Sequence, residues 1–82
     1  MNVREAVGWA RKAAEKSGRD AAILDTLANL LWISGARDEA VKTEEEALGK
    51  AEGAMKRDFE GVLARWRADA EAMKASGAVP MT

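Results

Sequence analysis

Apolar residues recur at intervals of three and four along most of the chain, which is the period of an α-helix. In the first stretch these positions are Val3, Ala6, Val7, Ala10, Ala13 and Ala14. Asn2 stands just before them and Glu5 follows three residues later, a pairing typical of a helix N-cap. Gly18 favours the left-handed conformation in which many helices end. We therefore expect a first helix over residues 3–17.

A second stretch is apolar around more than half of its circumference. Its apolar residues are Ile23, Leu24, Leu27, Ala28, Leu30, Leu31, Trp32 and Ile33. Asp20 is a suitable N-cap and Ser34-Gly35 a suitable end, so we expect a helix over residues 20–34. A helix that is apolar on most sides packs between neighbours, so this one is expected at the centre of the fold.

The remaining pattern predicts two more helices, over residues 38–52 and 54–75. Asp38 is the expected cap of the third helix, whose middle carries Glu44, Glu45 and Glu46. We expect these carboxylates to point partly to water. The fourth helix has a one-sided apolar stripe, which consists of Met55, Phe59, Val62, Leu63, Trp66, Ala70 and Met73. Ser76-Gly77 is expected to end it and to leave residues 76–82 as a flexible tail.

No proline separates the third helix from the fourth. An alternative is therefore one continuous rod of about 38 residues, roughly 57 Å long at 1.5 Å per residue. Such a rod could not fold back on itself and would pack against a second chain.

Composition fits one small helical domain over residues 1–75 and excludes several function classes. The 82 residues hold 13 basic and 14 acidic side chains, a net charge of −1, which gives no positive field for nucleic acid. Histidine and cysteine are absent, so the usual zinc ligands, a thiol nucleophile and the commonest general base are missing. We expect no enzyme activity, catalytic residue, cofactor or metal. No apolar run is long enough for a membrane and no signal peptide is evident, so a cytoplasmic protein is expected.

One segment of the chain returns after 34 residues. Arg4-Glu5-Ala6-Val7 matches Asp38-Glu39-Ala40-Val41, and at the same shift Ala13 meets Ala47 and Lys16 meets Lys50. A period of about 34 is that of the tetratricopeptide repeat, in which helix pairs stack. Small residues that recur at this step indicate close crossings between helices.

The chain resembles the tetratricopeptide family on these residues. Leu24, Leu27, Ala28 and Leu31 stand where the first helix of a repeat packs, Gly35 stands at its turn, and Ala40 and Ala47 stand at the small positions of the second helix. Glu44 departs from the family, which commonly has an aromatic residue there. The segments 22–28 and 35–40 resemble the C-terminal repeat of bacterial multi-repeat proteins, which often carry thioredoxin-like, kinase or sulfatase-type domains upstream. The resemblance implies an all-α, antiparallel array of about four helices.

The resemblance also implies a module that binds a protein or peptide on the concave face of the array. The candidate residues are Ala22, Asp25, Asn29, Trp32 and Ile33. Trp32 has a second interpretation, in which it packs against the first helix or a second chain.

One and a half repeats are fewer than the three or so that a stack generally needs, so we expect self-association, as a homodimer. The candidate residues are Trp9, Met55, Phe59 and Trp66. Core packing is the alternative role for Trp66. Two other functions remain open: a structural or regulatory appendage of a larger bacterial enzyme, and a small adaptor or antitoxin-like protein.

Overall fold

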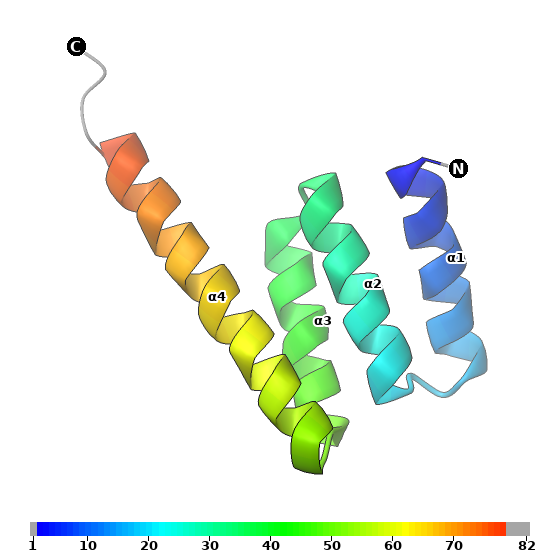
Figure 1. Ribbon diagram of the computed structural model, residues 1–82. Coiled ribbons are helices and arrows are strands. Elements are labelled where there is room, and N and C mark those ends of the chain that lie inside the picture. The colour runs from blue at the N-terminus through cyan, green and yellow to red at the C-terminus, as the bar shows by residue number, and fades with distance from the viewer. Residues whose placement is uncertain (1, 79–82) are drawn as a thin grey trace.

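The described part of the chain is an all-α array of four helices, as predicted. The computed structural model describes residues 2–78, with side chains as far as residue 72. The helices are α1 (Val3–Lys16), α2 (Ala21–Ser34), α3 (Arg37–Lys50) and α4 (Gly53–Ala78). Each helix packs against the next and runs antiparallel to it (Figure 1). The chain therefore forms a row of helices with α1 at one edge and α4 at the other.

The first two helices begin and end where their sequence signals predict. The side chain of Asn2 accepts a hydrogen bond from the backbone N–H of Glu5 at 2.8 Å. Asp20 accepts from the N–H groups of Ala22 and Ile23. After the helices the chain turns through Gly18, at φ 70°, and Gly35, at φ 96°. Both glycines thus take the left-handed conformation that a Cβ disfavours.

The cap predicted for the third helix is wrong. Helix α3 begins at Arg37, and Asp38 lies inside its first turn. The capping position is Ala36, which makes no side-chain capping hydrogen bond. The N–H of Ala36 donates to the carbonyl of Leu31, and this bond ties the start of α3 to the end of α2.

The alternative of one continuous rod is also wrong. Ala51 is extended, with φ −88° and ψ 154°, and Gly53 has φ 61°, so the chain reverses between α3 and α4. The expected helix end at Ser76-Gly77 is wrong as well, because α4 continues to Ala78. Residues 79–82 of the expected tail lie outside the described residues.

The core lies along α2 and on the faces of the other helices that point toward it. Its buried apolar residues are Ala10, Ala14, Ala21, Leu24, Leu27, Ala28, Leu31, Ala40, Ala47, Ala51, Phe59, Leu63 and Trp66. Ala40 and Ala47 have no exposed surface, whereas Ala6 and Ala13 are half-buried. The repeated alanines therefore lie at crossings in α3 and beside a partly open crossing in α1.

Ion pairs tie α3 to its surroundings. Glu39 binds Arg11 of α1 at 2.6 Å, and Glu45 binds Arg67 of α4 at 2.9 Å. Glu46 binds Arg19 in the turn between α1 and α2. Two of these pairs join α3 to other helices and one joins it to a turn. Their side chains are largely exposed to water, so they fix the register of the helices more than they stabilise the fold.

Candidate interaction surfaces

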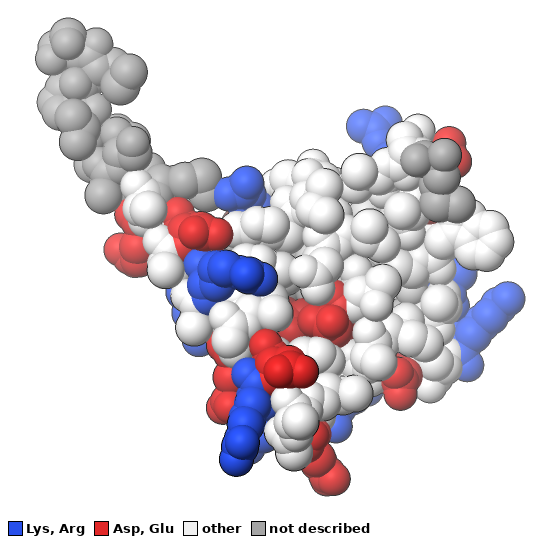
Figure 2. Space-filling model, in the orientation of Figure 1, with Lys and Arg blue, Asp and Glu red and all other residues white. Residues whose placement is uncertain are grey.

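The five candidate residues of the concave face lie along α2 with different exposures. Ala22 and Ile33 are exposed, and Asp25, Asn29 and Trp32 are half-buried. The Nδ2 of Asn29 donates to the backbone carbonyl of Asp25 at 2.8 Å and to its Oδ1 at 3.3 Å. The amide is thus already engaged within α2. The surface over α2 is largely uncharged, apart from an acidic patch between α2 and α4 (Figure 2).

Trp32 is not free to grip a peptide. Its ring stacks on Trp66 of α4, with centroids 4.7 Å apart and planes within 3°. The guanidinium of Arg37 lies over the ring of Trp32, 4.5 Å from its centroid. Trp32 therefore packs within the chain, but on α4, so the second interpretation named the wrong partner when it placed Trp32 against the first helix or a second chain. Stacked aromatic pairs and cation–π contacts each add about 0.5–1.5 kcal/mol to the burial itself.

Glu44 corrects the expectation that the acidic middle of α3 points to water. Its side chain has no exposed surface. Among the described residues, no N–H or O–H group donates a hydrogen bond to either Oε atom of Glu44. Its polar neighbour is Asp25, whose carboxylate is also an acceptor, so only a proton can join the two groups. Burial, and then the hydrogen bond and charge of Asp25, raise the pKa of Glu44 to about 8.

A carboxylic acid with a raised pKa is also a feature of catalytic sites. Here the carboxyl of Glu44 is closed off from the surface, so a substrate could not come within hydrogen-bonding distance of it. We conclude that Glu44 is a neutral core residue at neutral pH. The sequence held a signal for this burial, because Glu44 lies four residues after Ala40 and three before Ala47, on the face of the small repeated positions.

The four candidates for self-association separate into two groups. Trp9 is 69% exposed and Met55 is 40% exposed. Phe59 and Trp66 are 6% and 3% exposed and belong to the core of the chain itself. The prediction that Phe59 and Trp66 form an interface is therefore corrected, since burying them against α2 and α3 leaves no surface to offer. Trp66 takes its alternative role in the core.

Trp9 lines a shallow apolar groove between α1 and α2, which we call the α1–α2 groove. It is lined by Ala6, Trp9, Ala10 and Ala13 of α1 and by Thr26 and Leu30 of α2, and its volume is about 370 Å³. Nearly all of the surface in it is apolar. An indole beside such a groove is typical of an interaction site.

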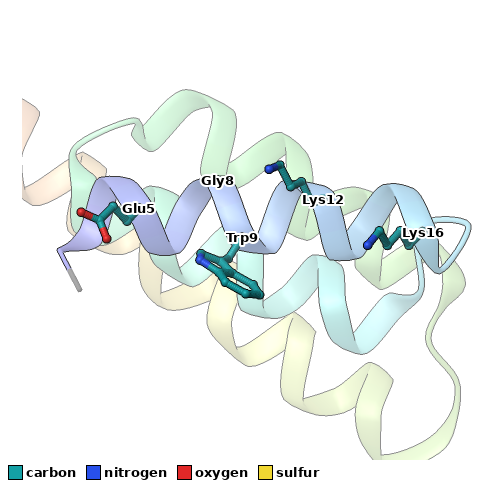
Figure 3. A pocket seen from close by; sticks show the side chains of 5 residues that line it. All are labelled: Glu5, Gly8, Trp9, Lys12 and Lys16. Atoms are coloured by element: carbon teal, nitrogen blue, oxygen red, sulfur yellow. The ribbon is translucent and has the colours of Figure 1, made fainter.

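A second depression, of about 440 Å³, follows the side of α1 away from the core, which we call the outer face of α1. It consists of Glu5, Gly8, Trp9, Lys12 and Lys16. Glu5 lies toward the N-terminal end, the two lysines lie toward the C-terminal end, and Trp9 stands between them (Figure 3). Trp9 therefore belongs to both surfaces.

The 34-residue repeat relates the α1–α2 groove to the interior of the protein. The groove residues Ala6, Trp9, Ala10 and Ala13 correspond at this shift to Ala40, Thr43, Glu44 and Ala47 of α3. All four residues of α3 are buried, with exposed fractions of 7% or less. Helix α3 has packed neighbours on two sides, α2 and α4, whereas α1 packs mainly on α2. The groove residues of α1 thus correspond to a face that is buried in α3. In α1 this face lacks one of the two helices that cover it in α3.

Other kinds of site are not found in the described part of the chain. No helix there is long and apolar enough to cross a membrane. No group of three or more acidic side chains there could hold a metal ion. The chain matches no known protein-family model, no curated protein and no solved structure.

Proposed function

We propose that this protein is a non-catalytic protein–protein interaction module, built of tetratricopeptide-like helices, that binds through its α1–α2 groove. The single observation that carries the proposal is the exposure of Trp9, at 69%, beside an apolar groove that repeats a buried face of α3. Large aromatic side chains supply much of the binding energy in protein interfaces, and an exposed indole contributes none of it until a partner covers it.

The groove also fits a helix better than it fits a small molecule. It runs along two antiparallel helices and has small side chains, Ala6, Ala10 and Ala13, on its α1 side. Small residues let a third helix approach closely, as Ala40 and Ala47 do inside the chain. The expected partner is therefore a protein that presents an apolar helix face.

The concave face remains the competing surface, and Ile33 provides the comparison. Ile33 is 67% exposed, close to the 69% of Trp9, but it lies on α2 outside the groove. Trp32, the largest predicted contact of the concave face, already stacks on Trp66. The α1–α2 groove is thus the better candidate.

The test compares Trp9→Ala with Ile33→Ala. Association of the purified chain is measured by sedimentation equilibrium, and binding to co-purified proteins is measured by titration. We expect Trp9→Ala to weaken binding to another protein by about 30-fold or more, since an indole at the centre of an interface contributes about 2 kcal/mol or more, and to weaken a symmetric dimer further because both copies lose the indole. We expect Ile33→Ala to change it by less than about threefold. A larger effect of Ile33→Ala than of Trp9→Ala would place the site on the concave face. The proposal is refuted if the chain associates neither with itself nor with another protein.

The appendage hypothesis makes a different prediction. A helix supplied by the same polypeptide would then occupy the groove and cover Trp9. Fusing an apolar helix to the N-terminus through a short linker would quench self-association and raise the midpoint of thermal unfolding. If the fused chain still associated as strongly as the unfused one, the binding surface would lie outside the groove.

A further inference from the structure

We infer that a second copy of the same chain covers Trp9 from the outer face of α1, next to the α1–α2 groove, with the two α1 helices packed antiparallel across these outer faces. This inference rests on the proposed function, because Trp9 lines both the groove and the outer face. The outer face of α1 is self-complementary in charge and in shape, which is the requirement for a two-fold symmetric interface.

Charge is the first part of that complementarity. Glu5 lies toward one end of the face and Lys12 and Lys16 lie toward the other, with Trp9 between them (Figure 3). In an antiparallel pair, the acidic end of each helix meets the basic end of the other. The carboxylate of Glu5 accepts a hydrogen bond from the Nδ2 of Asn2, at 3.3 Å. Among the described residues, neither lysine takes part in an ion pair. All three charges are therefore available to a partner.

Shape is the second part. The register that sets Glu5 opposite the partner's Lys12 also sets Gly8 opposite the partner's Trp9. Each indole then lies over a residue that has no side chain. Gly8 has no neighbour within 4 Å of the position of a Cβ atom, so nothing inside the chain requires a glycine there. A glycine inside a helix costs about 1 kcal/mol relative to alanine, and the partner's indole supplies a reason for it.

Among the described side chains, the other edge of the array has one exposed large apolar residue, Met55 in the first turn of α4, at 40% exposure. From Lys56 to Ala72 the exposed positions of α4 carry charged side chains, alanine and glycine, and none of them is a large apolar residue. Head-to-tail stacking, with α1 of one copy on α4 of the next, would leave Trp9 against this polar helix. Symmetric pairing gives both tryptophans an apolar contact and closes the assembly at two copies.

The pairing is expected to be weak, because two single helices bury less than the roughly 1,200 Å² of a stable interface. We expect a dissociation constant of at least about 1 µM. Sedimentation equilibrium on the wild type, Glu5→Lys, Lys12→Glu and the double variant then tests the register. Each single reversal places two like-charge contacts in the dimer and should weaken it by about tenfold. The double variant should return to within about threefold of the wild type.

Two further variants separate charge from shape. Gly8→Gln fills the space over which the partner's indole would lie, so it should weaken the dimer while raising the thermal midpoint of the monomer. Glu60→Lys is the matched control, since Glu60 is an exposed acidic residue on α4, and it should leave association unchanged.

The outcomes distinguish this inference from the proposed function. If Trp9→Ala abolishes association but the double variant does not restore it, the groove still binds and the antiparallel register is wrong. Species larger than a dimer would overturn the symmetric pairing in favour of head-to-tail stacking. If the wild type stays monomeric to millimolar concentration, the second copy is not the occupant, and a partner protein that needs Trp9 would still support the proposed function.

Discussion

At the scale of single residues, Glu44 shows how burial, and after it a neighbouring carboxyl group, decides the charge of a side chain. A buried carboxylate without donors costs several kcal/mol, so the group is held as a neutral acid. Asp25, which is half-buried, is the neighbour to which the protonated Glu44 donates its hydrogen bond. Helix α2 and helix α3 are thus joined by one proton at a place where the related position in α1 has only Ala10.

The proton on Glu44 makes the stability of the protein depend on pH. The pKa of Glu44 is about 8 in the folded chain and 4.5 as its unfolded reference, so the folded state holds more protons between these values. Its stabilisation is complete below pH 4.5 and is lost as the pH rises through about 8. We expect the unfolding free energy to fall by up to about 1.4 kcal/mol per pH unit in this range.

Urea unfolding at several pH values measures this slope. Glu44→Gln cannot ionise and keeps a donor for Asp25, so most of the slope should disappear. A slope that persists in Glu44→Gln would place the titrating group elsewhere.

Trp66 and Trp9 are expected to contribute differently to the stability of the fold, and substitution of each by alanine compares their contributions. Trp66 is 3% exposed and stacks on Trp32, so Trp66→Ala should lower the unfolding free energy by about 3–5 kcal/mol. Trp9→Ala should lower it by less than about 0.5 kcal/mol at a concentration where the chain is monomeric. Chemical denaturation checks both, and Trp66→Phe serves if Trp66→Ala does not fold. Equal losses at the two positions would contradict the burial described for them.

At the scale of the helices, the sequence predicts helix ends well where the next residue must have a positive φ. Gly18 and Gly35 end α1 and α2 because the next backbone step needs a positive φ. The start of α3 could not be predicted in this way. It depends on a hydrogen bond from Ala36 to Leu31, formed by the turn as a whole, while Asp38 has the chemistry of a cap but stands two residues too late. Gly77 does not end α4, because a single glycine only weakens a helix.

The turn between α3 and α4 gives the clearest test of these rules. Gly53 has φ 61° and no neighbour within 4 Å of a Cβ position, so Gly53→Ala adds only conformational strain, about 1 kcal/mol. Gly61 lies in the interior of α4 with equally open surroundings, so Gly61→Ala should stabilise the chain by a similar amount. Thermal or urea unfolding compares them. Stabilisation by both substitutions would mean that the left-handed turn is not needed to separate α3 from α4.

At the scale of the whole molecule, the array is thin and uneven in its coverage. Its extents are 49 × 32 × 16 Å, so a large share of every helix faces outward. Helix α2 lies between α1 and α3, as its apolar circumference predicted, and α4 leans away from the other helices toward its C-terminal end (Figure 1). The edge at α1 carries the exposed indole. Stability gained by covering that edge is therefore expected to depend on protein concentration.

The pattern of the sequence was sufficient for the number of helices and for the central place of α2. It was insufficient for the interaction surface, because a tryptophan at helical spacing looks the same whether it is buried or exposed. Trp66 stands in the apolar stripe of α4 and Trp9 stands next to that of α1, and only the packing of neighbouring helices decides that one lies in the core and the other at an edge. The 34-residue repeat could have separated them, since it shows which face of α1 requires a covering helix.

The most direct test of the interaction surface is isotope-filtered NMR on a mixture of labelled and unlabelled chains, which reports only contacts between copies. We predict contacts from the Trp9 ring of one copy to α1 of the other, strongest at the Gly8 Hα protons. They should be absent in Trp9→Ala. Contacts confined to α4, or none at millimolar concentration, would contradict the account.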